Sequence, residues 1–195
     1  MEKYFYEFDY KFNYEKLLLC AQNLSSKMIH QGKKKSKDGL NKKIKKYDAT
    51  ANSWVKILRG LEHEDNEDCK FIKNEVSKFT DKIGCNNYNI VLYEYDNRSF
   101  VDWHVDGRGK DLGRVNLVLT PNHPGITYFR DNDNLNNIPL CAKLSAINAY
   151  NIEHKYDNNG LDTRILLLIT TNDLFYDELL MKIKEQQYLK NESFL

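Results

Sequence analysis

The sequence lacks several features that would place a chain of 195 residues in a special class. It has four cysteines, and no two of them form a C-x-x-C pair. Scattered cysteines in apolar or helical surroundings are usually buried thiols, so we expect no disulfide framework. The 29 basic residues balance 28 acidic ones, for a net charge of +1. The overall charge therefore gives no reason to expect nucleic acid or a membrane as partner.

Long apolar runs are also missing. The opening "MEKYFYEFDYKF" is charged and aromatic, which does not fit a signal peptide, and no later stretch reaches the length of a membrane span. We therefore expect a cytoplasmic protein without a membrane partner, and the sequence leaves its oligomeric state open. The length suits a single domain over residues 1–195. Eight lysines within residues 33–46 predict an exposed loop or a lid.

Helical patterns occupy the first part of the chain and its end. The aromatic opening alternates like a short strand, and Asn13 can cap a helix that follows it. From Glu67, apolar residues recur every three or four positions as far as Gly84, which predicts an amphipathic helix. A last helix is predicted from Asn172, with Thr171 or Asn172 as its cap.

Between these helices, short runs rich in β-branched and aromatic residues predict six strands. Turn residues separate the runs, and strands at such short spacing favour a sandwich or a barrel. The runs are "YNIVLYEY", "FVDWHVD", "RVNLVLT", "GITYFR", "SAINAYNIEH" and "RILLLITT".

One of these runs contains His104 and Asp106, two residues apart. Side chains at positions i and i+2 of a strand lie on the same face, so this pair could share one cation. A bare H-x-D is more often an ordinary exposed pair, because short motifs have many false matches. His154, just before the turn "DNNG", offers a third ligand. Two histidines and one carboxylate are the ligand set of non-haem Fe(II) oxygenases.

Arg164 follows His154 by ten residues and begins the apolar run "RILLLIT". We expect a hairpin that sets Arg164 beside His154 on a neighbouring strand. There its planar guanidinium could pair with a carboxylate, since burying it without such a partner would be costly. The alternative is that Arg164 reaches solvent from a strand end.

With these residues in view, the chain resembles the 2-oxoglutarate- and Fe(II)-dependent oxygenases, especially the aspartyl/asparaginyl β-hydroxylase and prolyl-hydroxylase-like branches. The resemblance rests on H-x-D, a distal histidine and the arginine ten residues later, and it covers about residues 88–171. It implies an α+β, mainly β fold: a double-stranded β-helix, that is, a cupin-like jelly roll, buttressed by N-terminal helices and followed by a C-terminal helix. It also implies that His104, Asp106 and His154 hold iron and that Arg164 binds the cosubstrate.

The resemblance extends to four further candidate cofactor-binding residues, Arg114, Asn116, Tyr93 and Tyr95. Arg114 and Asn116 stand where the aspartyl hydroxylases have an arginine and a histidine facing the cosubstrate. Tyr93 and Tyr95 share one face of the strand before the H-x-D strand, and their alternative role is that of core aromatics. On the "GITYFR" strand, Tyr128 and Arg130 are expected to line the substrate side of the pocket.

The activity implied is that of a dioxygenase using Fe(II), 2-oxoglutarate and O2. Such an enzyme would hydroxylate an amino acid, a peptide or another small substrate and release succinate and CO2. Two alternatives stay open. One is an AlkB-type nucleic-acid demethylase. The lysine-rich segment favours this alternative, whereas the balanced total charge argues against it. The other is a cupin-like metal-binding module without turnover, in which Arg164 would have no purpose.

Overall fold

The structure of the protein is a computed structural model that describes residues 2–30, 55–97, 99–106, 112–120, 126–130, 138–158 and 162–192. The lysine-rich segment 33–46 lies outside these ranges. The prediction that it forms a loop or lid therefore stays a prediction.

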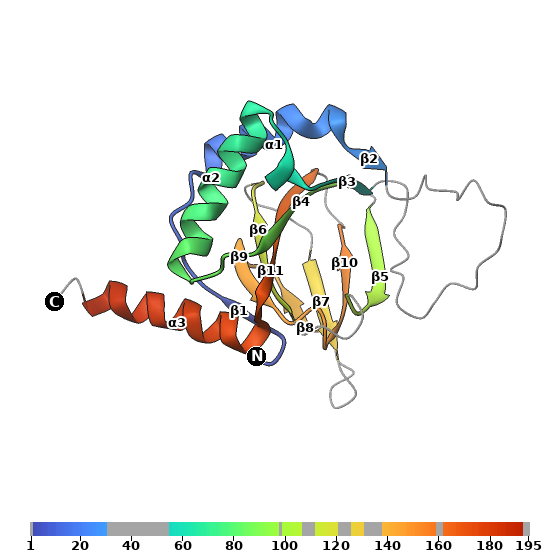
Figure 1. The fold of residues 1–195 in the computed structure, drawn as a ribbon. Helices are drawn as coiled ribbons and strands as arrows, with labels where there is room; N and C mark the ends of the chain where they lie inside the picture. Colours follow the sequence, from blue (N-terminus) through green and yellow to red (C-terminus); the bar gives the residue numbers. More distant parts are fainter. Residues whose placement is uncertain are drawn as a thin grey trace.

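Two antiparallel sheets face each other, and helices cover the outer side of the larger one (Figure 1). The larger sheet has the strand order β1-β9-β6-β11-β4-β3-β2, and the smaller one the order β5-β10-β7-β8. The strands are β1 (Phe5–Glu7), β2 (Ile29–His30), β3 (Val55–Arg59), β4 (Tyr88–Tyr95), β5 (Phe100–His104), β6 (Leu112–Val118), β7 (Ile126–Arg130), β8 (Ile138–Leu140), β9 (Leu144–Ile147), β10 (Glu153–Asp157) and β11 (Arg164–Phe175). The helices are α1 (Tyr14–Leu24), α2 (Glu67–Lys82) and α3 (Tyr176–Glu192), with short 3-10 turns η1 (Ser25–Lys27) and η3 (Leu61–His63). This arrangement confirms the expected fold class.

The main core lies between the larger sheet and the helices α1 and α2. The Asn13 side chain caps α1 by accepting from the Lys16 amide, and the Asn66 side chain caps α2 in the same way. The apolar positions predicted for α2 are buried, among them Ile72 and Phe79. They pack on the side chains of β4, β6 and β11 that point toward the helices, such as Leu92 and Leu167. Burial of this face holds the helical layer on the sheet.

The opposite face of the larger sheet looks toward the smaller sheet. Because side chains alternate along a strand, the residues of β11 between the core positions turn the other way. Arg164, Leu166 and Leu168 thus line a cavity between the two sheets, together with residues of β4 and β6. The fold therefore separates a packed core on one side of the larger sheet from a cavity on the other.

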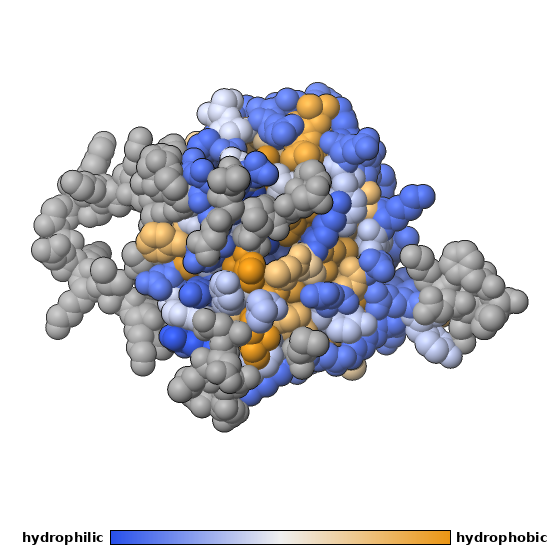
Figure 2. Space-filling model, turned by 180° about the vertical axis from the view of Figure 1, so that it is seen from behind, coloured by the Kyte–Doolittle hydropathy of each residue, from blue (hydrophilic) through white to orange (hydrophobic). Residues whose placement is uncertain are grey.

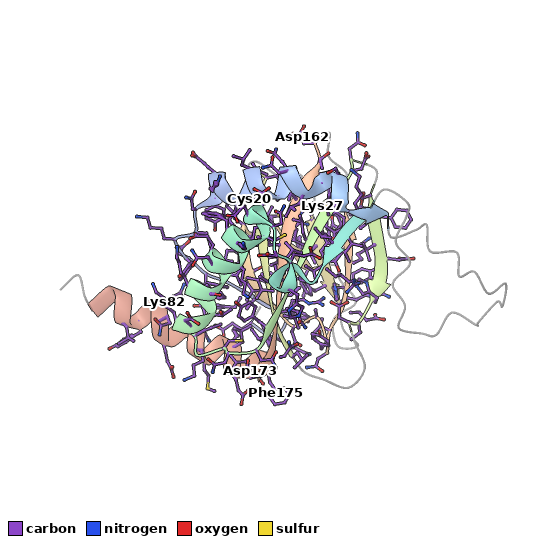
Figure 3. All side chains as sticks on the ribbon, turned by 45° about the horizontal axis from the view of Figure 1, so that its top comes forward. Cys20, Lys27, Lys82, Asp162, Asp173 and Phe175 are labelled. Atoms are coloured by element: carbon purple, nitrogen blue, oxygen red, sulfur yellow. The ribbon has the colours of Figure 1, made fainter. Side chains whose placement is uncertain are left out.

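Asp173 ties the end of β11 to the turn after α2. Its carboxylate accepts hydrogen bonds from the backbone amides of Asn86 at 2.8 Å and Asn87 at 3.1 Å, and from the Cys85 thiol at 2.9 Å. Asp173 and Phe175 lie at the same end of the molecule, near the start of α3 (Figure 3). The link holds together two segments that are distant in the sequence.

The structure corrects several expected elements. The run "SAINAYNIEH" forms two strands, since β9 ends at Ile147 and β10 begins at Glu153. Strands β2, β3 and β8 were not predicted. The C-terminal helix begins at Tyr176 and not near Thr171 or Asn172, because both of these residues continue β11. The Asn172 amide also donates to the Asn87 carbonyl at 2.7 Å, which extends the pairing beside β4.

The expected hairpin between His154 and Arg164 is also wrong. Strand β10 pairs with β5 and β7, whereas β11 pairs with β4 and β6 in the other sheet. The chain thus crosses between the sheets after β10. Arg164 faces β10 across the cavity instead of pairing with it.

The four cysteines are unpaired, as expected from the sequence. Cys20, Cys69 and Cys85 are buried, but Cys141 is exposed, so the expectation of a buried thiol is wrong there.

In the part of the chain that the structure describes, no helix has the length and apolar character needed to span a membrane. Seen from behind, the surface is largely hydrophilic, with apolar side chains gathered near the middle of the view (Figure 2).

Candidate active site

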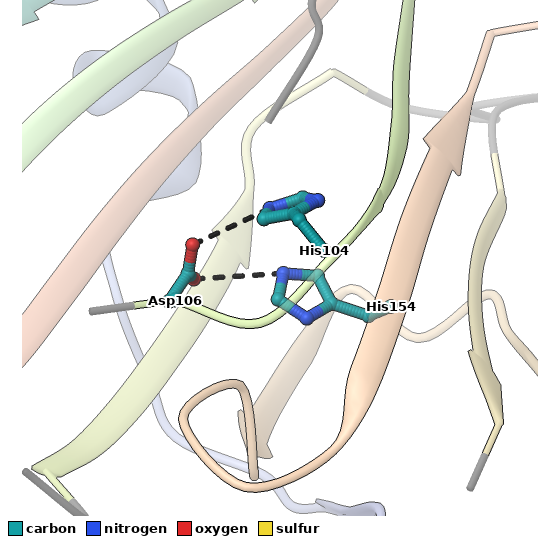
Figure 4. A group of neighbouring side chains, drawn as sticks. All are labelled: His104, Asp106 and His154. Atoms are coloured by element: carbon teal, nitrogen blue, oxygen red, sulfur yellow. Dashed lines mark ion pairs between the residues drawn. The ribbon is translucent and has the colours of Figure 1, made fainter. Parts of the chain in front are cut away.

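His104, Asp106 and His154 meet at the cavity between the sheets (Figure 4). His104 on β5 and His154 on β10 are cross-strand partners, with ring centroids 4.2 Å apart. Asp106 follows β5, and its backbone amide donates to the Ala149 carbonyl at 2.8 Å. The candidate ligand atoms of the three side chains lie within 4.8 Å of one another. The sequence prediction that these three residues come together is thus met by the geometry.

A β-bulge in β5 aims His104 into the cavity. His154 pairs with His104, but Tyr156 pairs with Val101, so β5 has one residue more than β10 over this stretch. The Asp102 carboxylate accepts from the Trp103 backbone amide at 2.9 Å within the bulge. The extra residue lets both Val101 and His104 line the cavity although they are three positions apart.

The two imidazoles are arranged as neutral ligands. The Nδ1 atom of His104 lies 2.6 Å from the Asp102 carbonyl, and that of His154 lies 3.3 Å from the Ile152 carbonyl. A backbone carbonyl can only accept, so Nδ1 donates and Nε2 keeps its lone pair. Burial lowers the pKa of His104 and, more strongly, that of His154, where the neighbouring His104 adds to the effect. Both Nε2 atoms therefore suit a metal ion.

The Asp106 carboxylate lies opposite both Nε2 atoms. Its Oδ1 is 3.3 Å from Nε2 of His104, and its Oδ2 is 3.5 Å from Nε2 of His154. The Arg114 guanidinium on β6 forms an ion pair with the same carboxylate. It also lies over the Tyr150 ring, at 5.3 Å from the centroid. Arg114 thus fixes the orientation of the Asp106 carboxylate.

Arg164 lies at another part of the same cavity, which has a volume of about 280 Å³. Its side chain is 4% exposed, and its guanidinium carbon lies 4.6 Å from the centroid of the Tyr156 ring. Among the described residues, no carboxylate forms an ion pair with Arg164, and its Nε has no hydrogen-bond acceptor. A buried guanidinium without an anion is costly, so this end of the cavity suits an anionic ligand.

The other predicted cofactor-binding residues, Tyr93, Tyr95, Arg114 and Asn116, also line this cavity. The rings of Tyr93 and Tyr95 stack at 5.6 Å, and Tyr95 lies 4.2 Å from the Tyr156 ring. Burial raises the pKa of Tyr95 well above its ordinary value, so its phenol stays protonated. The Oδ1 atom of Asn116 is buried and has no donor among the described residues.

Tyr128 and Arg130 do not line the cavity, contrary to expectation. Along β7, the cavity side is taken by Thr127, and Phe129 packs near the His154 ring. Tyr128 and Arg130 alternate to the outer face, where Arg130 pairs with Glu153. The prediction thus assigned the side chains of this strand to the wrong faces, because nothing in "GITYFR" distinguishes the face toward the cavity from the outer face.

Sequence reasoning also missed Arg59 and Tyr156, which both line the cavity. Arg59 ends β3, a strand that was not predicted. The alternation of Val55, Ile57 and Arg59 would have placed all three on one face. Tyr156 stands two residues after His154, so the same alternation would have placed it beside this ligand.

No family model matches the sequence, and no curated protein matches it. The structure is similar to a prolyl-4-hydroxylase from Pseudomonas putida, with a TM-score of 0.54 and 10% identity over 86% of this chain and 91% of that one. It is also similar to a prolyl hydroxylase from Trichoplax adhaerens, solved in complex with a hypoxia inducible factor peptide fragment. There the TM-score is 0.60, with 13% identity over 90% of this chain and 84% of that one. The resemblance to prolyl hydroxylases thus holds at the level of the fold.

Proposed function

We propose that the protein is a 2-oxoglutarate- and Fe(II)-dependent dioxygenase that hydroxylates an amino acid, a peptide or another small substrate. The observation that carries this proposal is the pairing of two features in one cavity. The His104, Asp106 and His154 cluster lies beside a buried guanidinium, that of Arg164, which lacks an anionic partner among the described residues.

The ligand cluster fits Fe(II). Two imidazole nitrogens and one carboxylate oxygen are the ligand set of non-haem Fe(II) oxygenases, which leaves coordination positions open. The Nδ1 contacts of both histidines with backbone carbonyls fix the rings, as is usual around metal-binding histidines. His104, Asp106 and His154 would therefore hold the ion, and Arg114 would keep the Asp106 carboxylate in place.

Arg164 fits the distal carboxylate of 2-oxoglutarate. Tyr156, which packs on Arg164, is two residues from His154 on β10, a distance of about 7 Å at 3.3 Å per residue. A five-carbon dicarboxylate can bridge a gap of that size. A charge-assisted pair through two parallel guanidinium N–H groups would give the buried cation its anion.

Fe(II) with 2-oxoglutarate and O2 supplies the oxidising chemistry, which yields succinate and CO2 and adds one oxygen atom to a substrate C–H bond. The residues of this chain bind and orient the components. Val101, Leu166 and Leu168 contribute apolar walls that limit water in the cavity. One similar structure contains a peptide, which supports a peptide or a smaller molecule as substrate.

Succinate formation tests the proposal. The purified protein, supplied with Fe(II), 2-oxoglutarate and O2, should form succinate, and this should stop when Fe(II) is withheld. Addition of the true substrate should raise the rate and increase the substrate mass by one oxygen atom. A protein that binds metal but never forms succinate, with any substrate pool, would instead be a metal-binding module.

A further inference from the structure

A second cavity of about 430 Å³ adjoins the first. The two cavities share Arg59, Tyr93, Arg114 and Leu168 in their walls. Arg114, which lines the second cavity, also pairs with Asp106, so one side chain connects this cavity with the candidate metal ligands. Its volume is in the range of small-molecule sites.

The second cavity lies away from Arg164. Arg59 on β3 is the cross-strand partner of Val91, which belongs to the row of Leu168 on β11. Leu168 is four residues from Arg164, a distance of about 13 Å along the strand. Arg59 lines both cavities, whereas Arg164 lines only the first one. The molecule thus has two cationic positions, Arg59 and Arg164, that are separated along the larger sheet.

The wall of the second cavity contains two guanidinium groups and, among the described residues, no carboxylate. Arg114 already has a partner in Asp106. Arg59 is exposed at the cavity and forms no ion pair within the described part of the chain. The remaining polar positions include Asn89, Thr170 and Asn172, which are uncharged. The cavity is therefore electropositive, and Arg59 is its available cation.

We propose that the second cavity is the substrate subsite and that it selects a small, amino-acid-like substrate with a free carboxylate bound by Arg59. This inference rests on the proposed function, because it takes Arg164 as the cosubstrate position. The planar guanidinium can bind a carboxylate through two parallel hydrogen bonds. The carboxylate would fix the substrate at one end, and its carbon chain would extend past Arg114 toward the ligand cluster.

Binding of matched acid and amide probes tests this subsite. L-Glutamine and its α-amide L-glutaminamide, and L-asparagine and its α-amide L-asparaginamide, are titrated into the protein loaded with Mn(II) and saturated with 2-oxoglutarate, so that each acid differs from its amide only in the α-carboxylate. At least one acid should bind about tenfold more tightly than its amide, and Arg59→Ala should remove this preference. Arg130→Ala is the matched control, because Arg130 lies on the outer face of the smaller sheet, and it should keep the preference.

Equal binding of acids and amides, no binding of either, or a preference that persists in Arg59→Ala would overturn the subsite. Binding of 2-oxoglutarate and succinate formation are measured in the same variants. Arg59→Ala should keep the affinity for 2-oxoglutarate within about twofold, since Arg59 is remote from Arg164. A wild-type protein that shows the Arg59-dependent preference but neither binds 2-oxoglutarate nor forms succinate would contradict the proposed function and leave the anion subsite standing.

Discussion

The Asp106 carboxylate is the most heavily shared group of the candidate site. It faces the Nε2 atoms of His104 and His154 and forms an ion pair with Arg114. Arg114 offsets the charge of the carboxylate when no cation is bound. Because the guanidinium is itself held over the Tyr150 ring, Asp106 is oriented before a metal ion arrives. Such preorganisation is what a metal site needs from its surroundings.

Removal of a single ligand should abolish metal binding. In calorimetric titrations with Mn(II), His104→Ala, Asp106→Ala and His154→Ala should each bind more than about a hundredfold more weakly than wild type, because loss of mere supporting contacts already costs up to that factor. His63→Ala is the control, since His63 is exposed in η3. Wild-type affinity in the Asp106→Ala variant would show that the cluster is not a metal site.

Spacing along the sequence was enough to predict which residues gather in the candidate site but not all of their surroundings. His104 and Asp106 could be selected because they are two residues apart, and His154 and Arg164 because they fit a family pattern. The bulge at Asp102 and Trp103 could not be predicted, since it arises from the pairing of β5 with β10. The sequence also could not predict whether Arg164 has an acidic partner, because this depends on the side chains that face it across the cavity.

At Gly113, the helix α3 packs closely on β6. A Cβ atom at this position would lie 2.5 Å from Oγ1 of Thr171 and 2.7 Å from Cδ2 of Leu179. Thr171 is itself fixed, because its hydroxyl donates to the Gly113 carbonyl at 2.9 Å. The close approach of helix and strand therefore requires glycine.

Gly113→Ala should lower the free energy of unfolding by about 1–3 kcal/mol, the usual cost of overpacking. Urea unfolding measures this change. Gly84→Ala serves as comparison: its positive φ of 68° strains an alanine, but no atom lies within 4 Å of the added Cβ. We expect a loss of about 1 kcal/mol there. If Gly113→Ala unfolds at the wild-type urea concentration, the packing of α3 on β6 is not as described.

Helices and strands could be predicted where the local residue pattern determines them. They could not be predicted where pairing with distant segments determines them. The spacing of apolar residues in α2 gave its extent, and the β-branched run of β11 marked a strand. The end of β11 was missed, because Asn172 favours a helix cap locally but pairs beside Asn87 in the folded sheet. The sheet that each strand joins was likewise not encoded in its own residues.

For the whole molecule, two carboxylates make stability depend on acid pH. Burial alone would raise the pKa of Glu75, but hydrogen bonds from Lys78 and the Asn13 amide outweigh it and lower the pKa below its ordinary value of 4.5. For Asp173, burial likewise opposes hydrogen bonds from Cys85, Asn86 and Asn87, and the pKa falls below 3.8. Both groups bind fewer protons in the folded state than in the unfolded state at acid pH.

The stabilisation from these groups is therefore complete above pH 4.5 and is lost as the pH falls through the lowered values. The urea midpoint should stay level near neutral pH and decline below about pH 4.5. A Glu75→Gln, Asp173→Asn double variant should be less stable at pH 7 and show a shallower decline. An equally steep acid decline in that variant would assign the effect to other groups.

In the proposed function, one cavity holds both the metal ion, at His104, Asp106 and His154, and the distal carboxylate of 2-oxoglutarate, at Arg164. Calorimetric titration of 2-oxoglutarate into the protein, with and without Mn(II), tests it most directly. The wild type should bind 2-oxoglutarate tightly only when Mn(II) is present, and Arg164→Ala should bind it more than about a hundredfold more weakly while it keeps its Mn(II) affinity. An affinity for 2-oxoglutarate that is the same with and without Mn(II), or that is unchanged in Arg164→Ala, would contradict the account.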